Sequence, residues 1–459
     1  MSGRGASALR CRPGWRISLT LAAWLGVWCP PLAAETLEQS LIAAYLANPE
    51  LEAGRAQQRA NDELVPQALG DWRPRLFANT GIQRNAGRSS VGDLDLTTRA
   101  SSLTLSQSLY AGGGTVAATS RAENLVSAGR ADLVALEQAI LLDAVDAYVA
   151  AWRDRAVLEL ARVNQQRLER QLQATRDRFE VGELARTDVA QAEARLSRAI
   201  SDVTQAGAAL AGADASFLQV IGREPRDLAD PVRLRGLPAS VAEAQAIAEA
   251  NPNVTAASFR LLAARDDVDV AFADLLPSLD LEGRLQYADD PQTTVDWSRS
   301  ASIGLNLSVP LYQGGAEYSR VRQSRQTVQQ RRQNLEAAHR GVQAAVATAW
   351  DNLLAATAAI RSFEDEVRAN EIAVEGVEQE AQAGLRTTLD VLDAQQELFT
   401  SQVNLVRARA VEVVASYQLK SAIGELTVAD LALPVEPYDP LLHYARTRNR
   451  LFGIDDRPG

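Results

Sequence analysis

The sequence predicts a mainly α-helical protein made of two copies of one unit, in which two β-strands precede a very long helix. Three observations support this prediction: an internal repeat, paired segments in which apolar and polar residues alternate, and two long stretches without proline. The composition agrees, because helix-forming Ala, Leu, Gln and Arg are abundant and aromatic residues make up only 5% of the chain.

The repeat is visible when the chain is compared with itself at an offset of 202 to 203 residues. The matches extend from Glu35 to about Leu426 in one register. They pair Asn48-Pro49 with Asn251-Pro252, Pro74 with Pro277, Leu109-Tyr110 with Leu311-Tyr312, Gly182 with Gly384, Asp188 with Asp390, and Ile221-Gly222 with Ile423-Gly424.

These matches divide the chain after its first 34 residues. The first structural repeat covers 35–239, the second covers 240–426, and a tail covers 427–459. We expect the tail to be extended, because its prolines disfavour regular structure.

Residues 1–34 have the pattern of a signal peptide. Four arginines precede an apolar core, and small residues follow before Glu35. The core is too short to span a bilayer, which favours cleavage over an uncleaved anchor. Both cysteines, Cys11 and Cys29, lie here, so the exported chain has none for a disulfide or a zinc site. Lipidation of Cys29 is disfavoured by the bulky Trp28 before it.

Charge and residue content exclude several classes of function. Removing the four arginines of the signal changes the formal net charge from -11 to -15, which argues against a nucleic-acid partner. The chain has no phosphate-binding loop, and we expect its two histidines, His339 and His443, to be polar surface residues. We predict no enzymatic activity, no cofactor and no metal.

Alternating apolar and polar residues predict two strands in each repeat. The first repeat shows the weaker pattern, at 76–82 and 103–109. In the second repeat the apolar positions are Leu279, Leu281, Leu285, Tyr287, Ile303, Leu305, Leu307, Val309 and Leu311. A soluble two-sided sheet would give the same alternation, but the chain offers no further strands for a second layer. A membrane barrel needs at least about eight strands, so several copies of the chain must each contribute four.

Proline is absent from Gly113 to Phe179 and from Gly314 to Ala383. A helix of about 67 residues would be roughly 100 Å long. Apolar residues from Val342 to Val367 alternate at spacings of four and three, as in a coiled coil. The return helix, 186–222, is shorter, but placed end to end with a helix at 49–72 it matches the long helix. A periplasmic scaffold or adaptor without a pore would explain these helices but not the strands.

With these elements placed, the residues resemble the TolC family of outer-membrane channel proteins over almost the whole exported chain. The matching words are Asn48-Pro49-Glu50, Pro277-Ser278-Leu279, Val309-Pro310-Leu311-Tyr312-Gln313-Gly314-Gly315, and the run from Gly384 to Ala394. The last two are specific when combined with the repeat.

The resemblance implies a homotrimer in the Gram-negative outer membrane, with a twelve-stranded barrel continued by a helical tunnel across the periplasm. It implies a passive duct of a tripartite efflux or type I secretion system. The partners would be outer-membrane lipid, a periplasmic adaptor protein and an inner-membrane transporter, either ABC-type or proton-driven. The sequence does not indicate the cargo.

Asp390 and Asp393 lie three residues apart and so share one helix face. Thr387 and Asp390 also fit a capping box, in which both side chains serve the helix start. The resemblance assigns the two aspartates to a pore constriction that selects cations, and a carboxylate can serve both roles. Around a threefold axis, repulsion between like charges should raise some of their pKa values.

The resemblance also places the closed end of the tunnel at the hairpin tips, near Gly182 and Gly384. It implies a gate latch in which Arg386 bonds toward Thr187 and Asp188 on the neighbouring hairpin. An aromatic residue that can take part in the family's latch is replaced by alanine in the second repeat, whereas the first repeat has Phe179. We therefore expect a weaker latch or a different one.

Overall fold

The computed structural model describes residues 34–90, 92–292 and 294–454. The predicted signal peptide lies outside these residues except for Ala34, and the unit that follows begins at Glu35. Its helices are α1 (Leu37–Ala47), α2 (Pro49–Asp62), α3 (Leu64–Leu69), α4 (Gly114–Glu180), α5 (Arg186–Ile221), α6 (Val241–Ile247), α7 (Pro252–Ala273), α8 (Ala316–Gln382), α9 (Thr388–Ala422) and α10 (Pro440–Thr447), with short 3-10 turns at Gly70–Trp72 and Ala248–Ala250. None of the helices in the described part is long and apolar enough to cross a membrane.

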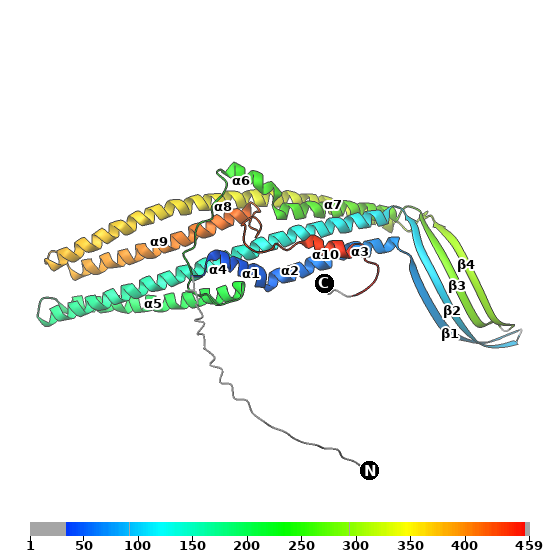
Figure 1. The fold of residues 1–459 in the computed structure, drawn as a ribbon, viewed down its shortest axis with the longest axis horizontal. Helices are drawn as coiled ribbons and strands as arrows, with labels where there is room; N and C mark the ends of the chain where they lie inside the picture. The colour runs from blue at the N-terminus through cyan, green and yellow to red at the C-terminus, as the bar shows by residue number, and fades with distance from the viewer. Residues whose placement is uncertain (1–33, 91, 293, 455–459) are drawn as a thin grey trace, which may run out of the picture. The chain divides into compact units, whose positions relative to one another are not determined.

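The four predicted strands form one antiparallel sheet in the order β1-β2-β3-β4 (Figure 1). They are β1 (Arg75–Ser89), β2 (Gly92–Ala111), β3 (Ser278–Gln292) and β4 (Val295–Ser308). Each repeat supplies one hairpin, and the hairpins join where β2 pairs with β3, for example Leu103 with Leu285. The sheet therefore unites the two repeats at the end opposite the helical hairpin tips (Figure 1).

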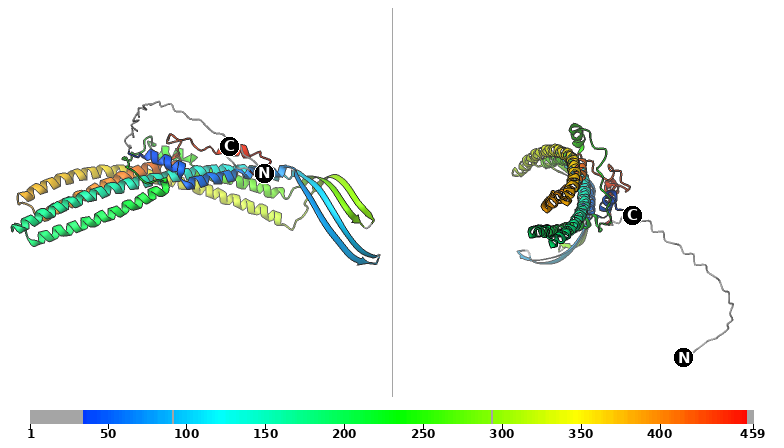
Figure 2. Two further views of the ribbon diagram at one scale, coloured as in Figure 1. Left: turned by 60° about the horizontal axis from the view of Figure 1, so that its bottom comes forward. Right: turned by 90° about the vertical axis from the view of Figure 1, so that its left-hand side faces the viewer.

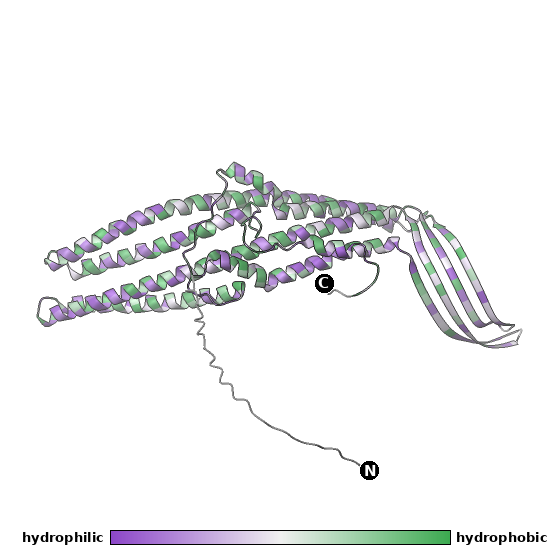
Figure 3. Cartoon of the chain, viewed as in Figure 1, coloured by the Kyte–Doolittle hydropathy of each residue, from purple (hydrophilic) through white to green (hydrophobic). Residues whose placement is uncertain are grey.

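One face of the sheet is apolar and exposed. Leu76, Leu105, Gly283 and Ile303 lie side by side in register across the four strands. The alternation of apolar and polar residues is visible along the strands in Figure 3. Ile303 is 79% exposed in the single chain, and a face this apolar needs an apolar environment.

The two long helices, α4 and α8, each contain 67 residues, as predicted. Each returns on itself as a hairpin, α4 with α5 and α8 with α9, while α7 packs against both long helices. Seen from the hairpin end, the helices lie on an arc (Figure 2, right). Such an arc has the form of a segment of a tunnel wall.

The shorter helices are joined end to end by one device that both repeats share. The side-chain oxygen of Asn48 accepts the N–H of Glu50 at the start of α2 at 2.9 Å, and its amide donates to the Val220 carbonyl at the end of α5 at 3.0 Å. Asn251 does the same for α7, and its amide donates to the Ala422 carbonyl at 3.0 Å. The sequence prediction that a return helix and a short helix together match the long helix is therefore right.

The largest apolar core lies beside the first of these junctions. Phe217 of α5 and Tyr148 of α4 are fully buried there, with ring centroids 6.4 Å apart. The Tyr148 hydroxyl lies 2.7 Å from the carbonyl oxygens of both Glu35 and Ala229. This hydroxyl ties Glu35, the first residue of the folded unit, to the linker that follows α5.

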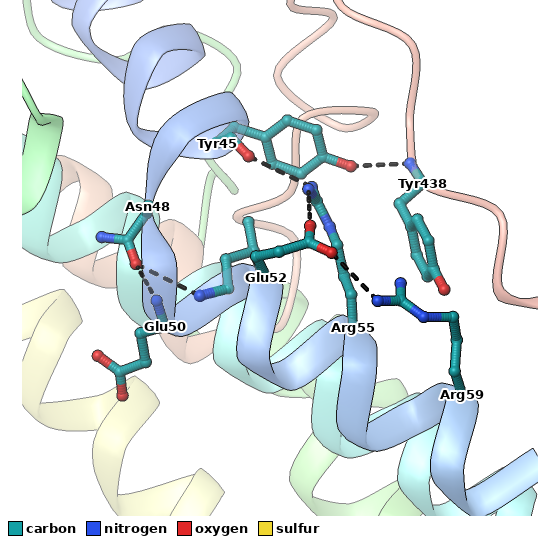
Figure 4. A network of polar contacts seen from close by, with 8 residues as sticks. Tyr45, Asn48, Glu50, Glu52, Arg55, Arg59 and Tyr438 are labelled. Atoms are coloured by element: carbon teal, nitrogen blue, oxygen red, sulfur yellow. Dashed lines mark hydrogen bonds and ion pairs between the residues drawn. The ribbon is translucent and has the colours of Figure 1, made fainter. Parts of the chain in front are cut away.

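The tail is not extended throughout, which corrects the sequence prediction. Residues 440–447 form α10, and the Tyr438 N–H donates to the Tyr45 hydroxyl at 2.8 Å. The guanidinium of Arg55 lies 4.6 Å from the centroid of the Tyr45 ring and 5.3 Å from that of Tyr438 (Figure 4). The prolines of the tail could not reveal that the tail docks here, because the residues that it contacts lie far away in the sequence, on α1 and α2.

The prediction for His443 as a polar surface residue is also wrong. Its Nδ1 lies 2.9 Å from a carboxylate oxygen of Asp62, whose side chain is only 1% exposed. The other carboxylate oxygen of Asp62 accepts a hydrogen bond from the Gln58 amide at 2.9 Å. His443 therefore fastens α10 to a polar group buried in α2.

Candidate functional site: the hairpin tips

Each hairpin tip is a tight turn built on a glycine with positive φ. Gly182 has φ 84° and Gly384 has φ 77°. The Gly182 N–H donates to the Phe179 carbonyl at 2.9 Å, and the Gly384 N–H donates to the Ala381 carbonyl at 3.1 Å. Any other residue would be strained in this conformation, so the two repeats need glycine at equivalent positions.

Asp390 caps the start of α9, as the sequence predicts. One of its carboxylate oxygens accepts the Thr387 N–H at 2.9 Å and the Thr387 hydroxyl at 2.8 Å. In return, the Thr387 hydroxyl oxygen accepts the Asp390 N–H at 3.3 Å. These bonds to the charged carboxylate, with a smaller contribution from Arg386, lower the pKa of Asp390 below its ordinary value.

Asp393 forms an ion pair that joins the two hairpins. A carboxylate oxygen of Asp393 on α9 meets the guanidinium of Arg195 on α5, and the two side chains are 54% and 29% exposed. Asp393 is therefore partly neutralised within one protomer. The equivalent position in the first repeat, Gln191, carries no charge.

The same contact between hairpins has an apolar part. Leu392 of α9 is almost completely buried, and it packs into a cluster with residues of the first hairpin. Its buried neighbours are Leu168, Leu172, Ala192 and Ala199. Arg195 and Asp393 thus lie at the exposed edge of a small apolar contact between the two hairpins.

The latch residues do not meet within the single chain. The Nε of Arg386 donates to Glu380 of its own hairpin at 2.8 Å. Asp188 accepts the Ala185 N–H at 3.1 Å, which caps α5. Among the described residues, Arg386 has no hydrogen bond or ion pair with Thr187 or Asp188. A latch between different protomers stays a prediction.

Sequence reasoning missed Arg195 and the packing of Leu392. Arg195 is separated from Asp393 by 198 residues, and no periodic pattern links the two. The described residues contain no group of three or more His, Cys, Asp or Glu side chains that could hold a metal ion. The tips are thus a site of ion pairs and helix caps.

Comparison with known proteins agrees with the repeat and with the fold. The profile of the family described as outer membrane efflux protein matches residues 42–223 and 244–425, one match for each repeat. The chain is 36% identical over 423 residues to the outer membrane efflux protein BepC of Brucella suis biovar 1, covering 92% of both chains. It is 30% identical over 425 residues to the outer membrane protein TolC of Vibrio cholerae serotype O1, covering 90% of this chain and 96% of that protein.

Comparison with solved structures shows that the fold is also that of outer-membrane channels. The crystal structure of the Campylobacter jejuni CmeC outer membrane channel superposes with a TM-score of 0.78 at 14% sequence identity, covering 90% of this chain and 89% of that one. The sequence matches span both repeats and nearly the whole length of the relatives. The chain belongs to the outer membrane efflux protein family, as an outer-membrane channel of the kind used in tripartite efflux or type I secretion systems.

Proposed function

We propose that the protein is a passive duct in which three protomers form the wall and the hairpin tips form a gate at the periplasmic end. The observation that carries this proposal is the four-stranded sheet, whose outer strands β1 and β4 each pair on one side only within the described residues. Three copies would supply twelve strands, and pairing of β4 with the β1 of the next copy would close the barrel.

The gate would carry a ring of carboxylates. Each protomer contributes Asp390, whose charge the helix cap favours, and Asp393, whose charge Arg195 partly cancels. The ring would therefore attract cations mainly through Asp390. The duct needs no catalytic group for this role.

Ion selectivity in planar bilayers tests the ring. Asp390→Asn combined with Asp393→Asn should reduce the preference for cations and the block by divalent cations, because negative charge is removed from the constriction. Arg195→Gln should shift selectivity in the opposite direction, because it leaves Asp393 uncompensated. The matched control is Asp365→Asn on α8, which removes a carboxylate from an exposed ion pair with Arg368.

Unchanged selectivity in both tip variants would remove these residues from the pore. A loss of cation preference in the Asp365→Asn control would mean that the effect is one of overall charge and not of the constriction.

The gate latch needs a separate test. Arg386→Ser should raise the open probability of single channels, because it removes the cation that we propose bonds to Thr187 and Asp188 of an adjacent protomer. Arg368→Ser is the matched control, since it breaks an exposed ion pair within α8. An open probability of Arg386→Ser at the wild-type level would refute the latch.

We also propose that the tips receive a periplasmic adaptor and an inner-membrane ABC or proton-driven transporter. Leu385 is 77% exposed beside Gly384, and the exported chain has no cysteine of its own. Leu385→Cys therefore gives a single crosslinking position at the tip. Capture of an adaptor would support the proposal, whereas the same products from a cysteine at exposed Val116 near the sheet would contradict it.

A further inference from the structure

The side chain of Arg299 lies on the apolar face of the sheet, near the turn between β3 and β4. The guanidinium carbon of Arg299 is 5.6 Å from the centroid of the Tyr287 ring and 5.3 Å from that of Trp297. Tyr287 is the partner of Arg299 in the β3 and β4 register, and Trp297 lies two residues before it, so all three share one face. Two aromatic rings thus hold the guanidinium in place.

Among the described residues, no carboxylate forms an ion pair with Arg299. Asp289, an acidic residue on the same face, lies opposite Arg99 with an N to O distance of 3.9 Å. The positive charge of Arg299 is therefore available to an external anion.

A groove runs beside this cation. Two rows in register share the face of Arg299, namely Ala78, Leu103, Leu285 and Ala301, and then Thr80, Ser101, Tyr287 and Arg299. The row between them, Asn79, Ser102, Gln286 and Ser300, also lines the groove. The alanines stand on the outer strands and the leucines on the inner ones, so the groove has an apolar floor. One end of it is cationic.

The position of Arg299 along β4 is that expected at the edge of the apolar band of an outer-membrane barrel. From Trp297 to Leu307, β4 covers roughly 33 Å along the strand, or roughly 25 Å along the membrane normal at a tilt of about 40°. That is the height of the apolar band of outer-membrane barrels. Trp297 and Tyr287 are 58% and 41% exposed and lie near the turn between β3 and β4, at the end of β4 remote from α8. With the helices in the periplasm, this end of the sheet would face the outer leaflet.

We propose that Arg299, Tyr287, Trp297 and the groove form a binding site for an anionic lipid of the outer leaflet. The phosphate of the headgroup accepts hydrogen bonds from the Arg299 guanidinium, whose planar fork matches phosphate geometry while its face stays on the rings. An acyl chain lies over Ala301, which is two residues from Arg299 on the same face of β4. Because the rings already hold Arg299, binding orders few additional side-chain rotations.

Native mass spectrometry of the purified oligomer tests this site. The protein is equilibrated with equal amounts of anionic phosphatidylglycerol and zwitterionic phosphatidylcholine in detergent, and the retained lipids are counted. Wild type should retain the anionic lipid preferentially. Arg299→Gln should reduce that preference about tenfold, which corresponds to about 1.4 kcal/mol. Arg322→Gln, which removes an exposed arginine on α8, should leave it unchanged.

A second variant tests the groove apart from the charge. Ala301→Leu fills the floor beside Arg299 and should reduce the number of retained lipids. Unfolding is excluded when the variants keep the wild-type mobility of the oligomer before heating.

Three results would overturn the proposal. They are an unchanged lipid preference in Arg299→Gln, an unchanged lipid count in Ala301→Leu, and displacement of the lipid by millimolar inorganic phosphate, which would indicate an anion site only.

Discussion

The two repeats use the same asparagine at their helix junctions, whereas their hairpin tips carry different side chains. Asn48 and Asn251 make matching pairs of bonds, with amide to carbonyl distances of 3.0 Å in both repeats. At the tips, Thr387 of the second repeat corresponds to Ala185 of the first, and Arg386 corresponds to a leucine. The junctions have the same task in both repeats, whereas in the proposed gate only one tip of each protomer carries the charges.

The junction cores allow the largest test of this comparison. Phe217 and Leu419 occupy equivalent positions, and both side chains are fully buried. Phe217→Ala should destabilise the protein by about 3–5 kcal/mol and Leu419→Ala by about 2–5 kcal/mol, because each leaves a cavity. The temperature at which the oligomer dissociates in detergent measures both. The exposed Thr204→Ala is the control, since its hydroxyl bonds only to its own helix.

A larger effect of Leu419→Ala than of Phe217→Ala would contradict the assignment of the main core to the first junction. Equal effects would mean that the additional packing of the tail and of Tyr148 around Phe217 contributes little.

The shared asparagines give a smaller and symmetric effect. Asn48→Ala and Asn251→Ala each remove a helix cap and a bond to the end of the return helix, and each should cost about 1–2 kcal/mol. The same dissociation temperature compares them. The double variant should show an additive loss, because the two asparagines share no hydrogen-bond partner and contact different helices. A difference of more than about 1 kcal/mol between the single variants would show that the junctions are not equivalent.

Features of the fold could be predicted where their signals are local in sequence, and could not where they depend on contacts between distant residues. The boundaries of α4 agree to within one residue with the proline-free stretch, and the strands follow from their alternation, because both signals are local. The pairing of β2 with β3 joins different repeats, and the docking of Tyr438 on Tyr45 spans 393 residues. No local pattern contains either contact.

The candidate site follows the same rule. The cap between Thr387 and Asp390 was predictable, since its two residues lie three apart and have the required types. The pairing of Asp393 with Arg195 was not, because the equivalent of Arg195 in the second repeat is Glu397 and the repeat gives no guide to it. At the junctions, by contrast, both repeats use the same asparagine, so one junction predicts the other.

The pH dependence of the second tip gives the smallest effect and compares two opposing causes. In one protomer, the bonds from Thr387 lower the pKa of Asp390 below its ordinary 3.8. Crowding of three such carboxylates around an axis would raise it. If the cap dominates, the ionised carboxylate stabilises the start of α9 fully above about pH 3.8, and this stabilisation is lost as the pH falls through the lowered pKa.

Cleavage by pepsin at the turn around Gly384 shows whether the pKa of Asp390 is lowered or raised in the oligomer. We expect wild type to resist cleavage at pH 4 and to be cut faster only as the pH falls well below 3.8. Asp390→Asn cannot titrate, so its cleavage should follow the activity of the protease alone. The first tip, where Asp188 caps without a threonine partner, serves as an internal reference. Loss of protection in wild type at a pH above 3.8 would mean that repulsion in the ring outweighs the cap, and that the charges of the gate govern its structure.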